Sequence, residues 1–528
     1  MENFQITWID IVIIAVYLVG ITIYGLSFAK KESSAKDYFL AGGKIAWPVI
    51  GISLIGANIT SITLIGLPGD AYSKGISVFN YEWTAAIILV FMSLFFIPFY
   101  LSSKIYTIPE FLERRYDRRS RMFFSALTVL SNIAVDIAGT LYGGYIVAKL
   151  VLPEADPILV ISLLAIAAAI YTIPGGLSSV IYTELIQTIL LLVASGIVAY
   201  ATFTQIGSWE NVVKVTPSEM LSLIRPIDDP HLPWTGLVFG VTLIGFYFWG
   251  TNQFMVQRTL SAIDLNHARW GSLFAAFIKL PILFMMVLPG TMARFLYPDL
   301  PKGDMVFPTL VFDILPVGLV GLVIAGLLAA MASSMSAALN SASTLLTMDY
   351  IRLIKPNWTS DQLVKAGKFI TFILLIAAIF TATQITKFDS LFTYVQMVLS
   401  YLVPPIAVVF IWGIFWRGAT ANAAFLSMLF GVITAVILLI FRDIGFIAEI
   451  HYLHKAPILF FLSSLVLVIF SKLDKNKPSI DVQENFIWSI NYFKEDMRHL
   501  KGLPWYKNYI NLSVLLLIVT AVLVYVYR

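Results

Sequence analysis

Apolar runs recur along almost the whole chain, and they constrain its fold more than any other feature. A helix of about 20 residues crosses the roughly 30 Å of a bilayer's hydrocarbon core, and these runs have that length. They lack the strict apolar–polar alternation that marks the strands of membrane barrels. Only 12% of the 528 residues are charged, about half the share of a soluble domain. The chain is therefore predicted to be an all-α, polytopic membrane protein.

About fourteen transmembrane helices are expected from these runs. They lie near residues 8–29, 46–67, 81–102, 121–150, 157–174, 179–204, 235–255, 269–293, 308–347, 366–384, 391–416, 420–441, 456–471 and 510–527. Lysine and arginine concentrate in alternate connections, a set to which Arg258 is assigned. The positive-inside rule then makes those connections cytoplasmic and both termini extracytoplasmic. Acidic residues precede the first run and lysines follow it, which favours an uncleaved span over a signal peptide.

Several classes of function are disfavoured by what the chain lacks. It has no cysteine, which excludes disulfides, cysteine zinc sites and iron–sulfur clusters. The net charge is +4, and the basic residues concentrate on one side of the expected membrane. This distribution indicates how the chain is oriented in the membrane and does not indicate nucleic-acid binding. The longest connections, 205–234 and 471–509, are too short for a soluble catalytic domain. We therefore expect no enzyme, no nucleic-acid partner and no obligate protein partner. The expected partners are the lipid bilayer and a small-molecule substrate.

Four ionisable residues fall at membrane depth: Glu82, Asp136, Glu184 and Lys279. Each costs about 2.5–3.5 kcal/mol on insertion scales, so each raises a functional hypothesis. A structural ion pair of Lys279 with a carboxylate from another helix is the plain alternative. Glu82 opens its helix, so a position at the rim facing water is the alternative there.

Two expected helices carry polar residues and glycines in mid-span. One is SLIGANITSITLIGLPG, which contains Gly56 and Asn58, and the other is LIGFYFWGTNQFMVQR, which contains Gly245 and Gly250. Transporters place such broken helices at their binding sites, in corresponding positions of two inverted repeats. The alternative is glycine used for close helix packing. Residues 46–204 and 235–418 are expected to form the two repeats, and 205–234 an extracellular loop between them. Residues 1–45 and 419–528 are expected to flank this core.

A helix rich in small residues, 325–344, brings Ala330, Ser333 and Ser334 near one face. Serine-rich helices often simply pack against their neighbours. Hydroxyls beside the carbonyls of a broken helix also form an all-oxygen cage with little charge. Such a cage suits Na⁺ better than Ca²⁺ or Mg²⁺, which prefer carboxylates.

The chain resembles the sodium:solute symporters, specifically their sodium/glucose cotransporter branch. The resemblance runs through DYFLAGG, SLIGANITS, YEW, YTIPEFLERRY, GGLSSVIYTELIQ, YFWGTNQFMVQRTLSA, FIKLPILFMMVLPG, SSMSAALNSASTLLTMD and YVQMVLSYLVPPIAVVFIWGIFWR. It covers nearly the whole chain and implies a LeuT-type fold, with a core of five-plus-five inverted repeats and flanking helices.

The resemblance also implies ion ligands, with Na⁺ as the coupling ion. The family's sodium site falls on Gly56, Ile59, Ala330, Ser333 and Ser334. A second sodium site, found in some members, falls on Glu184 and Ser336. Ala337 stands where a further hydroxyl is usual, so the match to the second site is incomplete.

The family's substrate and gate positions carry over in part. The substrate positions are Asn58, Thr63, Glu82, Trp249, Lys279 and Gln396, and the gates are Leu67, Tyr81, Phe248 and Phe392. A carboxylate, an ammonium and an amide supply the hydrogen-bonding partners that sugar hydroxyls need. Thr63, Gly245, Phe248 and Ala85 lack polar groups that relatives carry. The solute therefore need not be glucose, and another monosaccharide, an inositol or a sugar acid stays open.

Together these features predict a symporter that couples inward Na⁺ flow to uptake of a sugar or sugar-like polyol by alternating access. The alternatives are a Na⁺ symporter of a carboxylate, amino acid or vitamin, and a membrane sensor on the same fold. The absence of cysteine and of long glycosylation-ready loops fits a bacterial inner membrane.

Overall fold

The computed structural model describes residues 6–29, 41–151, 154, 156–385, 390–442, 444–500 and 502–528. Within these ranges the regular structure is helical. Ten helices are long and apolar enough to cross a membrane, or eleven if one bent pair counts as a single span. This confirms the predicted fold class.

The helices follow one another with short connections along both halves of the chain. The first half contains α1 (Trp8–Ala29), α3 (Trp47–Asn58), α4 (Ser61–Lys74), α5 (Asn80–Phe95), α6 (Ile97–Ser102), α7 (Ile108–Arg115), α8 (Arg118–Ser131), η3 (Asn132–Ile137), α9 (Ala138–Val151) and α10 (Pro157–Ile206). The second half contains α11 (Trp209–Val215), η5 (Gly236–Val241), α12 (Thr242–Phe246), η6 (Tyr247–Thr251), α13 (Gln253–Leu260), α14 (Leu265–Lys279), η7 (Leu283–Val287), α15 (Leu288–Leu296), α16 (Val306–Ile314), α17 (Leu319–Leu345), η9 (Leu346–Ile351), α18 (Arg352–Ile354), α19 (Ser360–Ile385), α20 (Leu391–Phe415), α21 (Ala421–Ile440), α22 (Gly445–Glu449), α23 (Tyr452–Leu473), α24 (Ile480–Asn485), α25 (Ile490–His499) and α26 (Tyr509–Val526).

Each expected membrane segment contains helix, although not always as a separate element. The expected spans 157–174 and 179–204 both belong to α10, because the backbone stays helical between them. Three expected segments coincide with shorter apolar helices, at Pro157–Ile166, Gly236–Thr251 and Leu319–Leu328. The pattern of apolar runs therefore located the helices well, and their limits less well.

The first predicted broken helix is confirmed by a 61° bend between α3 and α4. Ile59 and Thr60 leave helical geometry, with ψ values of 94° and 178°. The Thr60 hydroxyl accepts a hydrogen bond from the Ile62 amide at 3.0 Å, which caps the start of α4. A break of this kind frees backbone groups in mid-membrane.

The second predicted break lies at Asn252, between η6 and α13. Asn252 has an extended ψ of 125°, and its side chain accepts from the Phe254 amide at 3.3 Å. A π-helical turn, η6, precedes the break. Such turns are rare and often occur at functional sites, and η3 provides another one nearby in space.

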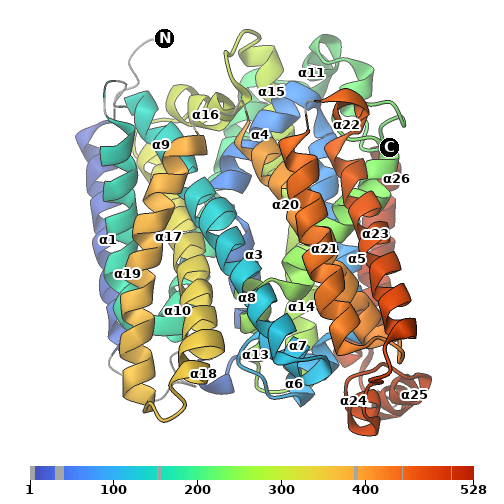
Figure 1. The fold of residues 1–528 in the computed structure, drawn as a ribbon. Helices are drawn as coiled ribbons and strands as arrows, with labels where there is room; N and C mark the ends of the chain where they lie inside the picture. The colour runs from blue at the N-terminus through green and yellow to red at the C-terminus, as the bar shows by residue number, and fades with distance from the viewer. Residues whose placement is uncertain are drawn as a thin grey trace.

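The helices form one bundle, with α1 and α19 at one side and α23 and α26 at the other (Figure 1). The two ends of the described chain meet the same end of this bundle. Near the C-terminus, the Tyr527 carbonyl accepts from the Leu223 amide at 2.8 Å, in the loop that follows α11. Near the N-terminus, Asp10 accepts from the Gly318 amide at the start of α17. We call this end the termini end.

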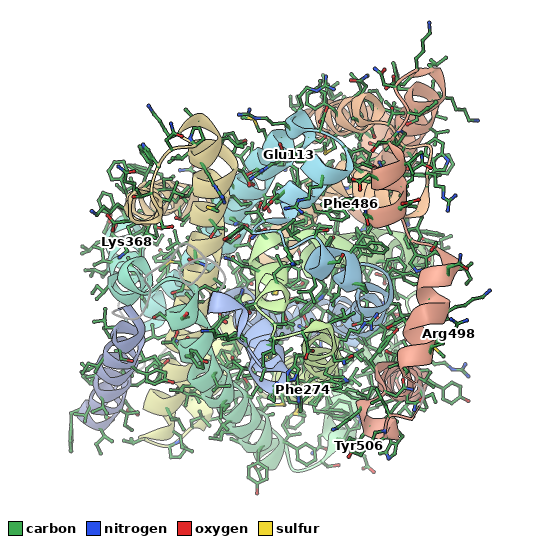
Figure 2. The ribbon with its side chains drawn as sticks, turned by 90° about the horizontal axis from the view of Figure 1, so that it is seen from below. Glu113, Phe274, Lys368, Phe486, Arg498 and Tyr506 are labelled. Carbon is green, nitrogen blue, oxygen red and sulfur yellow. The ribbon has the colours of Figure 1, made fainter. Side chains whose placement is uncertain are left out.

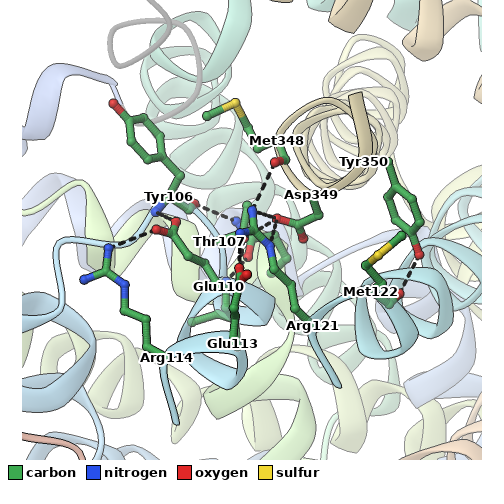
Figure 3. Close-up of polar contacts among 12 residues, drawn as sticks. Tyr106, Thr107, Glu110, Glu113, Arg114, Arg121, Met122, Met348, Asp349 and Tyr350 are labelled. Carbon is green, nitrogen blue, oxygen red and sulfur yellow. Dashed lines mark hydrogen bonds and ion pairs between the residues drawn. The ribbon is translucent and has the colours of Figure 1, made fainter. Parts of the chain in front are cut away.

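The basic connections gather at the opposite end of the bundle, which Figure 2 shows from below with Glu113 and Arg498 labelled. Many of their arginines hold loops in place. Arg121 pairs with the buried Asp349 at 2.7 Å, and Thr107 donates to the same carboxylate (Figure 3). These contacts fasten α7 to α8 and η9.

Candidate functional site

A central cavity lies where the two broken helices meet α5, η3, α17 and α20. The space enclosed by these elements is about 810 Å³ when the open solvent at its mouth is included. Nine of the residues predicted as ion ligands, substrate ligands or gates line it: Asn58, Thr63, Tyr81, Glu82, Phe248, Trp249, Ser334, Phe392 and Gln396. The fold therefore brings together residues that are more than 300 positions apart in the chain.

Two polar side chains at the first break line the cavity, and they differ in whether they are hydrogen-bonded. The Thr63 hydroxyl donates to the Asn58 backbone carbonyl at 3.0 Å and so spans the break. The Asn58 side-chain oxygen is buried and has no hydrogen-bond partner in the described part of the chain. Since a buried acceptor without a donor is costly, Asn58 is poised to receive a donor from a bound molecule.

Glu82 and Lys279 form a buried ion pair between α5 and α14. The carboxylate of Glu82 faces the cavity, whereas Lys279 stands behind it and does not line the cavity. The Lys279 ammonium also lies 5.6 Å from the centre of the Trp249 ring. The ion pair expected as the structural alternative for Lys279 is therefore present, and it holds Glu82 at the cavity wall.

Gln396 brings a second open acceptor from α20. The residue is only 9% exposed, and its side-chain oxygen has no partner among the described residues. Together with Asn58 and Glu82, it surrounds the cavity with oxygen acceptors. A molecule with several hydroxyl groups could donate to all three.

The residues expected to bind sodium come from the α3–α4 break and from α17. Gly56 and Ile59 lie at the end of α3, and α17 contacts both α3 and α4. Ser334 of α17 is 4% exposed, and its hydroxyl has no partner in the part of the chain described. The side chains of Ala330 and Ser333 lie outside the described residues.

Gly56 also lets α3 approach α10 closely. A Cβ atom at this position would come within 2.2 Å of the Thr188 hydroxyl, far inside a normal contact. A larger residue at position 56 would therefore force Thr188 or the two helices to shift.

Glu184 of α10 is held by two residues, Arg258 and Ser53. Arg258 Nε donates to Glu184 Oε2 at 3.1 Å, and a second guanidinium nitrogen pairs with Oε1. Ser53 of α3 also donates to this carboxylate. Glu184 and Arg258 are 0% and 1% exposed, so both carboxylate oxygens are engaged in a buried network. Ser336 is likewise buried, and the second sodium site stays a prediction.

The assignment of Arg258 to a cytoplasmic loop is wrong. Arg258 belongs to α13, the helix that follows the second break, and it is fully enclosed. The count of positive charges treats every arginine near a helix end alike, so it misses one that pairs with a carboxylate inside the bundle.

The expected gate residues form two aromatic groups. Tyr81 and Phe392 meet edge to face, with ring centres 5.2 Å apart. Phe248 packs against Trp249 and Phe254, at 5.3 and 5.6 Å. Leu67 is buried in α4 but does not belong to the cavity lining.

Sequence reasoning missed one contact of Tyr81, a predicted gate residue. The hydroxyl groups of Tyr81 and Tyr452 lie 3.1 Å apart. Tyr452 is the first residue of α23, in the expected C-terminal flanking segment, so its position in the sequence gave no sign of a role at the cavity. Asp136 also lines the cavity. Its expected depth in the membrane was the signal that could have placed it among the cavity residues.

Comparisons of the sequence with known proteins point to one family. Residues 38–431 match the model of the sodium:solute symporter family. The sodium/mannose cotransporter of Bos taurus is 32% identical, over 92% of this chain and 90% of its own. The sodium/myo-inositol cotransporter 2 of Mus musculus is 32% identical, over 91% and 79%.

Solved structures show the same fold. A Na⁺-coupled sialic acid symporter, caught in a substrate-bound outward-open state, superposes with a TM-score of 0.79 at 23% identity, over 90% of this chain and all of that one. Mhp1, a nucleobase-cation-symport-1 family transporter, superposes with a TM-score of 0.55 at 13% identity, over 86% and 98%. The all-helical architecture thus matches that of LeuT-type transporters.

Proposed function

This chain belongs to the sodium:solute symporter family, and we propose that it carries a sugar or sugar-like polyol into the cell together with Na⁺. Sodium-coupled transport of a solute follows from the family. The proposal concerns the class of solute and the residues that bind it and the ion. The observation that carries it is the central cavity, where acceptors from α3, α5 and α20 surround one space.

The sodium ion binds between the α3–α4 break and α17. Gly56, Ile59 and Ala330 contribute backbone carbonyls, and Ser333 and Ser334 contribute hydroxyls. Within the described part of the chain the buried Ser334 hydroxyl has no partner, which supports this assignment, since an ion would supply one. The ion also offsets the negative ends of backbone dipoles at the break, as in other transporters with broken helices.

The solute binds beside the ion, and its hydroxyl groups donate to Glu82, Asn58 and Gln396. Trp249, which lies at the cavity wall, packs against the apolar face of the sugar ring. Lys279 holds the Glu82 carboxylate in position through their buried ion pair. Relatives named for mannose and myo-inositol transport support a polyhydroxyl solute at about 32% identity.

Coupling follows from the geometry of the break. Sodium joins α3 to α17 and thereby orders Asn58, which lies at the end of α3. When the cavity opens toward the cytoplasm, these helices separate and the ion loses its ligands together. One charge that crosses 100 mV contributes about 2.3 kcal/mol, or roughly fiftyfold accumulation, before any sodium gradient is counted.

Uptake into proteoliposomes tests this proposal directly. Radiolabelled hexoses, myo-inositol and sugar acids are offered under an inward Na⁺ gradient, with K⁺ as the control. We expect uptake that needs Na⁺, increases with an inside-negative potential and falls at least tenfold in Gln396→Ala. The matched control is Asp361→Asn, at an exposed carboxylate on α19. Folded protein with no sodium-dependent uptake of any sugar would remove this class of solute.

A further inference from the structure

Lys455 is a buried cation to which the described chain offers no carboxylate. It is the fourth residue of α23 and is only 5% exposed. Its ammonium donates to the Tyr401 hydroxyl of α20 at 3.1 Å and lies 5.7 Å from the centre of the same ring. It forms no ion pair with any described residue. Because a buried charge is costly unless it is paired, this lysine calls for an explanation.

The other buried cations of the described chain show how this bundle satisfies such groups. Arg115 donates to three backbone carbonyls. The rest pair with carboxylates: Arg121 with Asp349, Arg225 with Asp229, Arg258 with Glu184, Arg269 with Asp496 and Lys279 with Glu82. Among the described residues, Lys455 is the buried cation whose partner is a single neutral hydroxyl. What it lacks is therefore a negative charge.

A second cavity, which we call the termini-end cavity, provides space for an anion beside Lys455. It lies among α20, α22, α23 and the loop after α11, and Figure 1 shows α22 at the end of the bundle where the C-terminus lies. Its charged and imidazole side chains are Lys74, Arg442, Lys455, His231 and His451. None of its described lining residues is a carboxylate. Lys74 is paired with Asp70 at 2.7 Å, whereas Lys455 is not paired.

His451 contributes a neutral donor to the same wall. Burial lowers its pKa to about 4, so the ring is uncharged near pH 7. Its Nδ1 accepts from the Leu453 amide at 3.3 Å, which places the ring hydrogen on Nε2. Nε2 is buried and has no hydrogen-bond partner in the part of the chain that the structure describes. The ring therefore offers an unused N–H donor at the wall of the termini-end cavity.

The ends of two helices make this cavity more positive. Ser390 and His451, which cap α20 and α23, both line it. The N-terminal end of a helix carries a partial positive charge and attracts anions. A lysine in the first turn of a helix is unfavourable for the same reason. A bound anion would offset both the helix ends and the charge of Lys455.

We propose that Lys455, together with the Nε2 hydrogen of His451 and the Tyr401 hydroxyl, forms a binding site for a small monovalent anion. One such ion balances the single charge of Lys455. The termini-end cavity shares no described lining residue with the central cavity, so the site is separate from those proposed for Na⁺ and the solute. Tyr452 also lines it, and a bound anion should therefore stabilise the arrangement in which Tyr452 and Tyr81 touch.

Binding of radioactive chloride, ³⁶Cl⁻, to purified protein tests the site without any transport assay. A scintillation proximity measurement at fixed Na⁺ concentration should show saturable binding of about one ion per chain. In Lys455→Met the half-saturating concentration should rise about tenfold or more, because a charge-assisted donor is lost. Lys455→Arg keeps the charge and should retain saturable binding. Lys214→Met, at an exposed lysine of α11, is the matched control and should bind like the unmodified protein.

Thermal melting distinguishes a bound anion from an internal counter-charge. When chloride replaces methanesulfonate at constant Na⁺ and ionic strength, the unmodified protein should become more stable and Lys455→Met should not. Without chloride, Lys455→Met should be at least as stable as the unmodified protein, because it buries no unpaired charge. If Asp389 or Asp443, which lie outside the described residues, supplied the counter-charge instead, chloride would have no effect and Lys455→Met would be less stable throughout.

Three results would overturn the inference. One is folded, unmodified protein that shows no saturable ³⁶Cl⁻ binding, and another is unchanged binding in folded Lys455→Met. The third is displacement of ³⁶Cl⁻ by phosphatidylglycerol in nanodiscs but not by inorganic anions, which would assign the site to a lipid headgroup. If Lys455→Met does not fold, Tyr401→Phe still tests the site, since loss of its hydroxyl should weaken binding about threefold. Because the assay contains no solute, failure of the proposed sugar transport would leave this inference standing.

Discussion

Removal of Arg258 alone should destabilise the protein strongly. Arg258 and Glu184 are 1% and 0% exposed, and the guanidinium contacts both carboxylate oxygens. Ser53 accepts from Arg258 Nε at 2.9 Å and joins α3 to the pair. Arg258→Met therefore leaves a buried carboxylate without a counter-charge. Breaking a buried pair in this way costs about 3–5 kcal/mol.

Removal of both charges should cost much less than the two single changes together. The double variant Arg258→Met/Glu184→Gln buries no unpaired charge, and such replacements are often close to neutral. We expect a coupling energy of about 2–3 kcal/mol between the two positions. The amide introduced by Glu184→Gln still offers Ser53 a hydrogen-bonding partner, so the third member of the network is not orphaned.

Thermal melting of detergent-solubilised protein, followed by size-exclusion chromatography, measures these effects. Each kcal/mol shifts the melting temperature by about 2 °C in a large domain, so Arg258→Met should lower it by roughly 6–10 °C. The double variant should recover most of that loss. Lys365→Met, which breaks an exposed pair with Asp361, is the matched control and should have little effect. Additive losses in the double variant would refute the reasoning.

Three further changes follow from the same structure. Tyr452→Phe removes one hydroxyl–hydroxyl contact with Tyr81. Since a neutral hydrogen bond contributes about 1 kcal/mol, the variant should open at the termini end about fivefold faster. An unchanged rate of solute release from that end would contradict this prediction. Ser334→Ala should raise the half-saturating Na⁺ concentration at least fivefold in uptake assays without lowering expression, and a normal sodium affinity would show that the hydroxyl is not a ligand. Burial, and then the neighbouring His454, lower the pKa of His451 to about 4. An unfolded histidine titrates near 6.5, so the folded state binds fewer protons and up to roughly 3 kcal/mol of stability is lost as the pH falls from about 6.5 to 4. Melting temperatures of His451→Gln should vary less across this range, and an equal dependence would exclude His451 as the source.

The broken helices could be predicted from sequence because their cause is local. Polar residues and glycines interrupt apolar runs at 56–61 and 245–252. A continuous membrane helix does not require such residues in mid-span, so their presence indicates a break. Thr60 and Asn252, which cap the helices after the breaks, are residue types that favour such positions. The pairing of Lys279 with a carboxylate from another helix could also be anticipated, because a buried ammonium needs a counter-charge.

Other parts of the site depend on contacts between distant segments. Arg258 and Glu184 are 74 positions apart, and the number of positive charges in loops gave no reason to pair them. Tyr452 reaches Tyr81 across 371 positions. The π-helical turn of Asp136 widens the helix by a single residue, and no periodicity in the sequence announces it. These features follow from how the helices pack.

The closure predicted at the termini end rests on weak contacts. At the termini end, Tyr81 is held by one aromatic contact and one hydroxyl pair, which together contribute about 1–3 kcal/mol. States with this contact formed and broken then differ in population by about tenfold to a hundredfold. Binding of a small solute is sufficient to reverse such a ratio. A closure held this weakly exchanges between its two states without help, so a measurable fraction of the molecules should be open at the termini end before any solute arrives.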